Sequence, residues 1–209
     1  MEIQIKKTIK AGNSSAVVLP RAWLNQEVRV ELIKKTPESM LYDVLEIIKK
    51  YIGLGEIIGI YLVGSYARGE ESKESDIDIL IITEEMDKEM IREGIYNILL
   101  VSQQLLYQKL EQNLFPVGQM IKEAKALLNS DYLNSIKTQI KVTKKNVRWY
   151  LDTTKEKLEI IKKYINETKN KNKKYIDERV VYTLILRIRT LHIIKKLIKN
   201  QDYSNKNFV

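Results

Sequence analysis

Residues 57–83 constrain the fold of this chain more than any other stretch. They hold two β-rich apolar runs joined by a polar loop. The loop opens with Gly64-Ser65 and closes with Asp76 and Asp78, the second of which already lies inside the second run. Alternate residues of a strand share a face, so we expect both carboxylates to point to one side while their apolar neighbours point into a core.

The acidic pair itself predicts a chemistry. Two like charges held one strand residue apart repel each other unless a cation lies between them. Hard divalent cations prefer carboxylate oxygens of this kind. We therefore expect Asp76 and Asp78 to form a magnesium site.

The order of strand, Gly-Ser, short helix and Asp-x-Asp strand resembles the DNA polymerase β superfamily, and its compactness is similar to that of the minimal nucleotidyltransferases. The resemblance implies transfer of a nucleoside monophosphate, here expected to be AMP from ATP, to an acceptor hydroxyl with release of pyrophosphate. It assigns catalysis and two Mg²⁺ ions to Asp76 and Asp78, and nucleotide binding to Gly64, Ser65 and Arg68. A plain charged surface loop is the alternative for Arg68.

One feature departs from the superfamily pattern. A third carboxylate usually comes from a later strand and helps to deprotonate the acceptor. The strand expected here, Tyr96 to Ser102, contains no Asp or Glu. Either Glu93 or Glu111 reaches the site, or two acids suffice, or catalysis is lost and the domain binds nucleotide as a sensor or partner module.

The first 35 residues form a separate pattern. Alternating runs at Glu2 to Ile9, Ala16 to Leu19 and Glu27 to Ile33 are joined by a Gly-Asn-Ser-Ser turn and a short helix that follows Pro20. Such a hairpin is too small to bury a core alone. Its turn and strand ends resemble the AbrB/MazE-like swapped-hairpin domain, in which two chains interleave into a small barrel.

That resemblance implies a homodimer and a possible contact with DNA. Cations would fix register on the phosphates, and an amide could meet base edges. The candidate DNA-binding residues are Lys6, Lys7, Lys10, Asn13, Ser14 and Arg21. Dimerisation without DNA binding is the equal alternative.

The C-terminal part has helical periodicity. Apolar positions from Leu133 to Ile165 predict one long amphipathic helix, a polar turn follows at 169–174, and a second helix is expected from 180 onwards, antiparallel to the first. Arg187 and the only histidine, His192, are separated by four residues, a spacing similar to the ribonuclease motif of HEPN domains. A partly buried histidine and a solvated arginine are the favoured alternative.

Composition limits the remaining possibilities. The chain has 209 residues, no cysteine and one histidine. Disulfides and thiolate metal sites are therefore excluded, and a histidine zinc site is not expected. We expect an α+β chain of three domains: a hairpin domain at residues 1–35, a nucleotidyltransferase domain at 36–130 and a helical domain at 131–209. The net charges of these ranges are +4, −7 and +12. No apolar stretch is long enough for a membrane span, and we expect a cytoplasmic protein.

Overall fold

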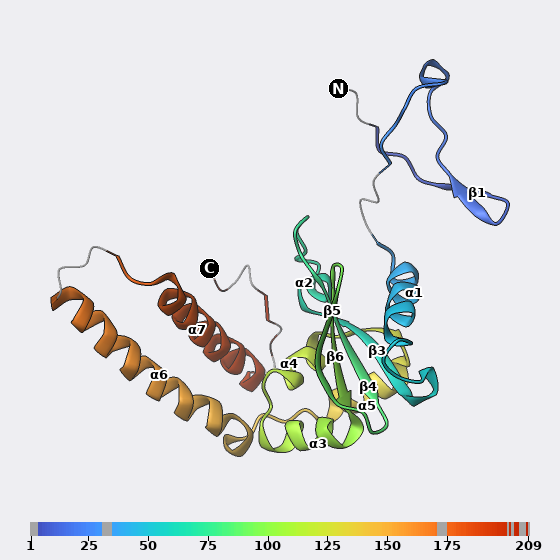
Figure 1. The fold of residues 1–209 in the computed structure, drawn as a ribbon. Coiled ribbons are helices and arrows are strands. Elements are labelled where there is room, and N and C mark those ends of the chain that lie inside the picture. The colour runs from blue at the N-terminus through green and yellow to red at the C-terminus, as the bar shows by residue number, and fades with distance from the viewer. Residues whose placement is uncertain are drawn as a thin grey trace. The chain divides into compact units, whose positions relative to one another are not determined.

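The computed structural model describes residues 4–30, 35–170, 175–199, 201, 203, 204 and 208 (Figure 1). The chain divides into two compact units, residues 1–35 and 36–209. The described α-helices are α1 (Pro37–Ile48), α2 (Gly64–Arg68), α3 (Gln103–Gln112), α4 (Val117–Glu123), α5 (Ser130–Gln139), α6 (Lys144–Asn170) and α7 (Glu178–Ile198). The strands are β1 (Ile9–Ala11), β2 (Ser14–Ala16), β3 (Ile57–Val63), β4 (Ile77–Thr83), β5 (Lys88–Glu93), β6 (Tyr96–Ser102) and β7 (Lys125–Leu128). Among the described residues, no helix combines the length and the apolar character that crossing a membrane requires.

The first unit contains a short antiparallel hairpin of β1 and β2, which turns at Gly12 with φ +62°. The expected strand bounds are wrong: the second strand is Ser14–Ala16, residues 4–8 and 27–30 are not strands, and positions 2, 3 and 31–33 lie outside the described residues. The physical reason is the absence of a core, since no described residue of this unit is buried. Ile5, Leu24 and Val30 are each at least 70% exposed, so this single chain offers the expected strands no apolar face to pack on.

The second unit is built on a mixed five-stranded sheet of order β5-β6-β4-β3-β7, in which β4 and β6 are parallel and the other pairs antiparallel. The α+β class is confirmed. Three strands, β3, β4 and β6, have the bounds that their apolar runs predict. The two edge strands, β5 and β7, were not expected from the sequence.

Helices cover both faces of this sheet. The side chains of β4 alternate, so that Ile79 and Ile81 pack in a cluster with Val44 and Ile48 of α1. Leu80 and Ile82 point the other way, into a cluster with side chains of α3, α4, α5 and the C-terminal helices. Ordered helices on both faces hold β3 and β4 in place, and these two strands carry the Gly-Ser turn and the acidic pair.

The expected long C-terminal helix is instead two helices, α5 and α6, separated at residues 140–143. Thr143 and Asn146 cap the start of α6 reciprocally, each side chain accepting from the other's backbone N–H at 3.2 and 2.9 Å. The Asn146 amide also donates to the Leu110 carbonyl of α3 at 2.9 Å, which anchors the break in the core. Helices α6 and α7 pack side by side as the predicted hairpin (Figure 1), while 171–174 of the predicted turn lie outside the described residues.

Candidate functional site

Asp78 lies on β4 and Asp76 directly before it, and both carboxylates point to the same side, as their spacing predicts. The apolar residue between them, Ile77, is completely buried. In the parallel pair of β4 and β6, Asp78 stands beside Asn97. The Asn97 amide nitrogen donates to Asp76 Oδ2 and to Asp78 Oδ1, each at 3.3 Å, so one small group reaches both carboxylates.

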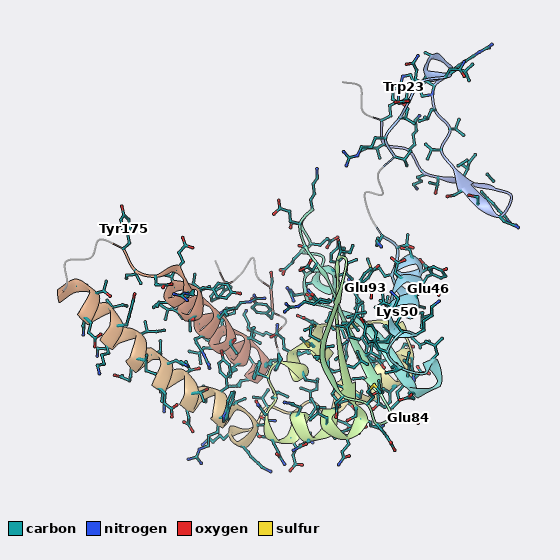
Figure 2. All side chains as sticks on the ribbon, in the orientation of Figure 1. Trp23, Glu46, Lys50, Glu84, Glu93 and Tyr175 are labelled. Carbon is teal, nitrogen blue, oxygen red and sulfur yellow. The ribbon has the colours of Figure 1, made fainter. Side chains whose placement is uncertain are left out.

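Asn97 lies on β6, the strand from which a third carboxylate was expected. The alternative that Glu93 or Glu111 supplies it is wrong. Glu93 forms an ion pair with Lys50 on the surface (Figure 2), and Glu111 pairs with Lys145 at 3.0 Å. Within the described part of the chain, no group of three or more His, Cys, Asp or Glu side chains could hold a metal.

The donor set still fits magnesium in part. Two carboxylates offer hard oxygen ligands, and Mg²⁺ commonly takes only one or two carboxylates from a protein while substrate phosphates and water complete its shell. No ion pair in the described ranges neutralises Asp76 or Asp78. The Asn97 amide presents its nitrogen to the pair, and a half-turn of the amide would present its oxygen instead.

Gly64 is required where it stands. It has φ +70°, and a Cβ on it would lie 2.2 Å from Asp78 Oδ2. A side chain at this position would therefore displace the carboxylate. The glycine lets the Gly-Ser turn lie directly against the acidic pair, while Ser65 follows on α2 and its carbonyl accepts from Glu70 N–H at 2.9 Å.

Arg68 is held by two carboxylates. Its Nε donates to Glu70 at 2.8 Å and its Nη1 to Glu123 at 2.6 Å, and all three side chains are at most 12% exposed. The other oxygen of Glu123 accepts from Gly64 N–H at 2.9 Å. Burial disfavours the guanidinium charge, but the contacts with Glu70 and Glu123 outweigh it and raise the pKa of Arg68. Arg68 is therefore not a simple surface charge, and its part in nucleotide binding stays a prediction. Glu123, at the end of α4, joins it to the turn.

Sequence reasoning missed Glu123 because it lies on a different helix, 55 residues from Arg68. No local pattern distinguishes it from the other glutamates, and only the packing of α4 against α2 brings it to the turn. Lys73, also in the loop, is exposed.

Burial raises the pKa of Asp78, and the Asn97 hydrogen bond opposes this shift. The Asp76 charge adds to the increase, whereas Arg68 lowers it. The carboxylate thus lies in surroundings that favour an added positive charge, which a bound cation would supply.

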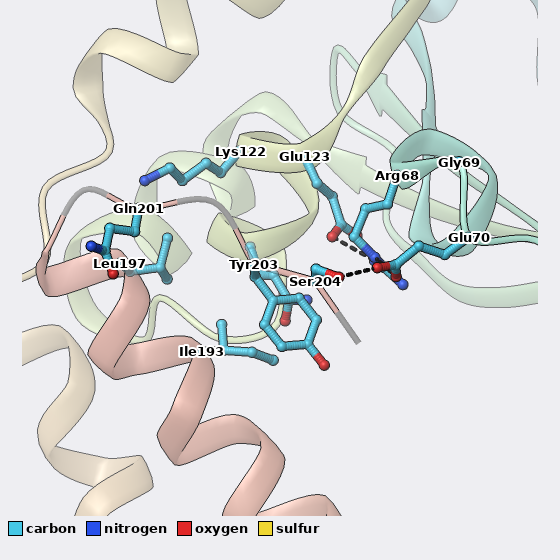
Figure 3. A pocket seen from close by; sticks show the side chains of 11 residues that line it. Arg68, Gly69, Glu70, Lys122, Glu123, Ile193, Leu197, Gln201, Tyr203 and Ser204 are labelled. Carbon is cyan, nitrogen blue, oxygen red and sulfur yellow. Dashed lines mark hydrogen bonds and ion pairs between the residues drawn. The ribbon is translucent and has the colours of Figure 1, made fainter. Parts of the chain in front are cut away.

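A cavity of about 430 Å³ opens beside the turn (Figure 3). Its volume falls within the range of small-molecule sites. Its lining comes from α2 and the two residues after it, from α4, from α7 and from the C-terminal segment: Arg68, Gly69, Glu70, Gln119, Lys122, Glu123, Ile193, Leu197, Gln201, Tyr203 and Ser204.

The candidate DNA-binding residues belong to the first unit. All six are exposed, with Lys10 on β1, Asn13 in the turn and Ser14 on β2, and with Arg21 in a 3₁₀ helix at Arg21–Trp23. Lys6 and Lys7 precede β1.

The structure gives Arg187 and His192 different partners. The Arg187 guanidinium lies 4.8 Å from the centre of the Tyr150 ring and donates to Thr153 at 3.2 Å. The His192 ring instead lies 6.0 Å from that of Tyr203. Residues five apart on a helix face different sides, and the ribonuclease hypothesis stays a prediction.

Comparison with known proteins matches the chain to a family model. The model of the nucleotidyltransferase domain matches residues 41–202. The comparison with curated proteins finds no relative.

Three solved structures share a limited likeness with the chain. One is a nucleotidyltransferase-like protein from Exiguobacterium sibiricum 255-15, with 19% identity, a TM-score of 0.37, and coverage of 75% of this chain and 58% of that one. The others are a toxin–antitoxin with AMP-PNP, at 16% identity, and a mutant of the toxin–antitoxin MntA-HpeT, at 14%. Each has a TM-score of 0.29, and each match covers 59% of this chain and 97% of the other chain.

Proposed function

This chain belongs to the nucleotidyltransferase domain family, and we propose that it transfers a nucleoside monophosphate, AMP from ATP, to an acceptor hydroxyl. The observation that carries the proposal is the Asn97 amide in contact with both Asp76 and Asp78 beside the Gly64 turn. It shows two acids converging on one point with no ion pair on either among the described residues. That is the arrangement a metal-bound triphosphate needs.

The residues have distinct roles in this proposal. Asp76 and Asp78 hold magnesium, which when bound supplies positive charge to the entering and leaving oxygens. Gly64 and Ser65 bring the backbone close to the phosphates. Arg68, fixed by Glu70 and Glu123, sets the shape of the turn and contributes charge near Asp78. Positioning and charge account for most of the catalysis in this chemistry.

The proposal also covers the role of the first unit and the class of acceptor. We assign residues 1–35 to a homodimer through AbrB/MazE-like hairpins, because their apolar side chains are exposed in the single chain. A protein hydroxyl in a toxin–antitoxin pair, an RNA end or a small molecule would each suit the acceptor site, in a cytoplasmic protein.

The proposal is tested by incubating the full chain with Mg²⁺, cell extract and each of the four α-labelled nucleoside triphosphates. We expect label to move from ATP to an acceptor and pyrophosphate to be released. Absence of turnover with every nucleotide would overturn the enzyme assignment.

A DNA-binding regulator with an inactive nucleotidyltransferase-like domain is the second candidate. Asn97 favours it, because an amide cannot take the acceptor's proton as a carboxylate can. The two candidates predict different results for one substitution at this position.

Asn97→Asp should raise the transfer rate if the site is active. A third carboxylate next to Asp78 would add a metal ligand and a general base, and general bases contribute about 10²–10⁴-fold; we expect at least about a tenfold gain. Mg²⁺ should also raise the Tm of the variant more than that of the parent, because binding stabilises the folded state. Asn97→Ala, which adds no carboxylate, is the control and should show no such gain. A transfer rate of Asn97→Asp equal to that of the parent would favour the regulator.

Removing residues 1–35 should convert the dimer to a monomer in sedimentation. If the exposed cations of the hairpin contact phosphates, the parent should retain DNA in a salt-dependent way and the truncated chain should lose at least about tenfold in affinity. Dimer loss without any DNA retention by the parent would assign the unit to dimerisation alone.

A further inference from the structure

The C-terminal segment docks beside the Gly-Ser turn. The centre of the Tyr203 ring lies 5.6 Å from the guanidinium carbon of Arg68 and 5.7 Å from that of Arg189. Arg189 also donates to the Tyr203 hydroxyl at 2.8 Å, and the His192 ring meets the Tyr203 ring edge-on. These contacts with α2 and α7 fix the position of the next residue, Ser204.

The Ser204 hydroxyl donates to Glu70 (Figure 3). Glu70 uses its other oxygen to bind Arg68, which orients the carboxylate. A hydroxyl bonded to a carboxylate that a third group holds in place is the arrangement of a nucleophile, its base and an orienting residue. The Glu70 carboxylate can therefore accept the proton of the Ser204 hydroxyl. The Asn97 amide cannot do this for an acceptor beside Asp76 and Asp78.

A series of hydrogen bonds links this arrangement to the proposed nucleotide site. Glu70 N–H binds the Ser65 carbonyl, and Arg68 shares Glu123 with Gly64 N–H. Gly64 in turn lies against Asp78. Arg68, Glu70 and Ser204 all line the cavity of about 430 Å³, which has room for a small ligand next to the hydroxyl.

We propose that Ser204 is an internal acceptor, so that the protein nucleotidylates its own C-terminal segment. The Ser204 Oγ attacks the α-phosphorus of a nucleoside triphosphate, and a new O–P bond forms. The bond from the α-phosphorus to the oxygen bridging to the β-phosphorus breaks, and pyrophosphate leaves with the electron pair. The hydroxyl proton passes to the Glu70 carboxylate. The inference rests on the proposed transferase function and names one acceptor for it.

The test is intact-mass and peptide analysis of the full chain after incubation with ATP and Mg²⁺. We expect a mass increase of one AMP, located on Ser204. It should fall at least about tenfold in Ser204→Ala and persist in Ser204→Thr, which keeps a hydroxyl. Ser135→Ala, a change of an exposed serine on α5, should not alter it.

Failure of this inference and failure of the transferase function give different results. Pyrophosphate release and labelling of an acceptor in extract, with no AMP on Ser204, would overturn the internal acceptor and leave the transferase standing. AMP on Tyr203 or another residue would also overturn it. No pyrophosphate release and no label on any acceptor would overturn both.

Discussion

Asp76→Asn/Asp78→Asn should abolish nucleotide transfer while leaving the fold intact. Both carboxylates converge on the Asn97 amide beside Gly64, and neutral amides of the same shape would remove the charge that holds a divalent cation. We expect a loss of about 10³-fold or more, equivalent to about 4 kcal/mol of transition-state stabilisation. The measurement is label transfer from α-labelled ATP at saturating Mg²⁺.

Stability should move in the opposite direction to activity in the single variant Asp78→Asn. The pKa of Asp78 is raised from 3.8, so the folded chain binds this proton more tightly than the unfolded chain. Stability therefore falls as pH rises through the window above 3.8, and at neutral pH the folded state carries the cost of ionising this partly buried carboxyl group.

Asp78→Asn removes this cost, so its Tm at pH 7 should equal or exceed that of the parent, with a gap that narrows as pH falls. Thermal unfolding followed by circular dichroism at several pH values measures it. A variant that is less stable at neutral pH would show that the carboxylate is needed for the fold rather than for binding a cation.

Among the substitutions proposed for this chain, Arg68→Ala should cause the largest loss in the free energy of unfolding. It leaves Glu70 and Glu123 charged, nearly buried and without their cation. Removing one partner of a buried pair typically costs about 3–5 kcal/mol, which corresponds to a fall in Tm of roughly 10 °C for a chain of this length. Urea unfolding gives the free energy directly.

Arg148→Ala is the matched control, since the Arg148–Asp152 pair is 81% and 53% exposed and such pairs contribute about 0–1 kcal/mol. Arg68→Lys keeps the charge without the planar fork that reaches both carboxylates, so its stability should be intermediate. Equal unfolding free energies for Arg68→Ala and Arg148→Ala would contradict the structural role of the buried pair.

The sequence predicted β3, β4 and β6 with their bounds, and the convergence of Asp76 and Asp78. These features follow from short-range rules: apolar runs form buried strands, and residues two apart share a face. The same rules predicted the α6–α7 hairpin but missed the break before α6. The apolar spacing of the sequence continues through the break, whereas in the structure a helix cap and the hydrogen bond from Asn146 to the Leu110 carbonyl end the helix there. In the first unit, the pattern predicted strands that the single chain has no apolar face to support.

The sequence by itself determined the order of the sheet-forming runs, the Gly-Ser turn and the acidic pair, because each depends on residues close together in the chain. Only the tertiary structure decided what surrounds them. It places Asn97 beside Asp78, clamps Arg68 with Glu123 across 55 residues, and brings Ser204 to Glu70 across 134. Contacts over such separations depend on how helices pack on the sheet, and no local periodicity records that packing.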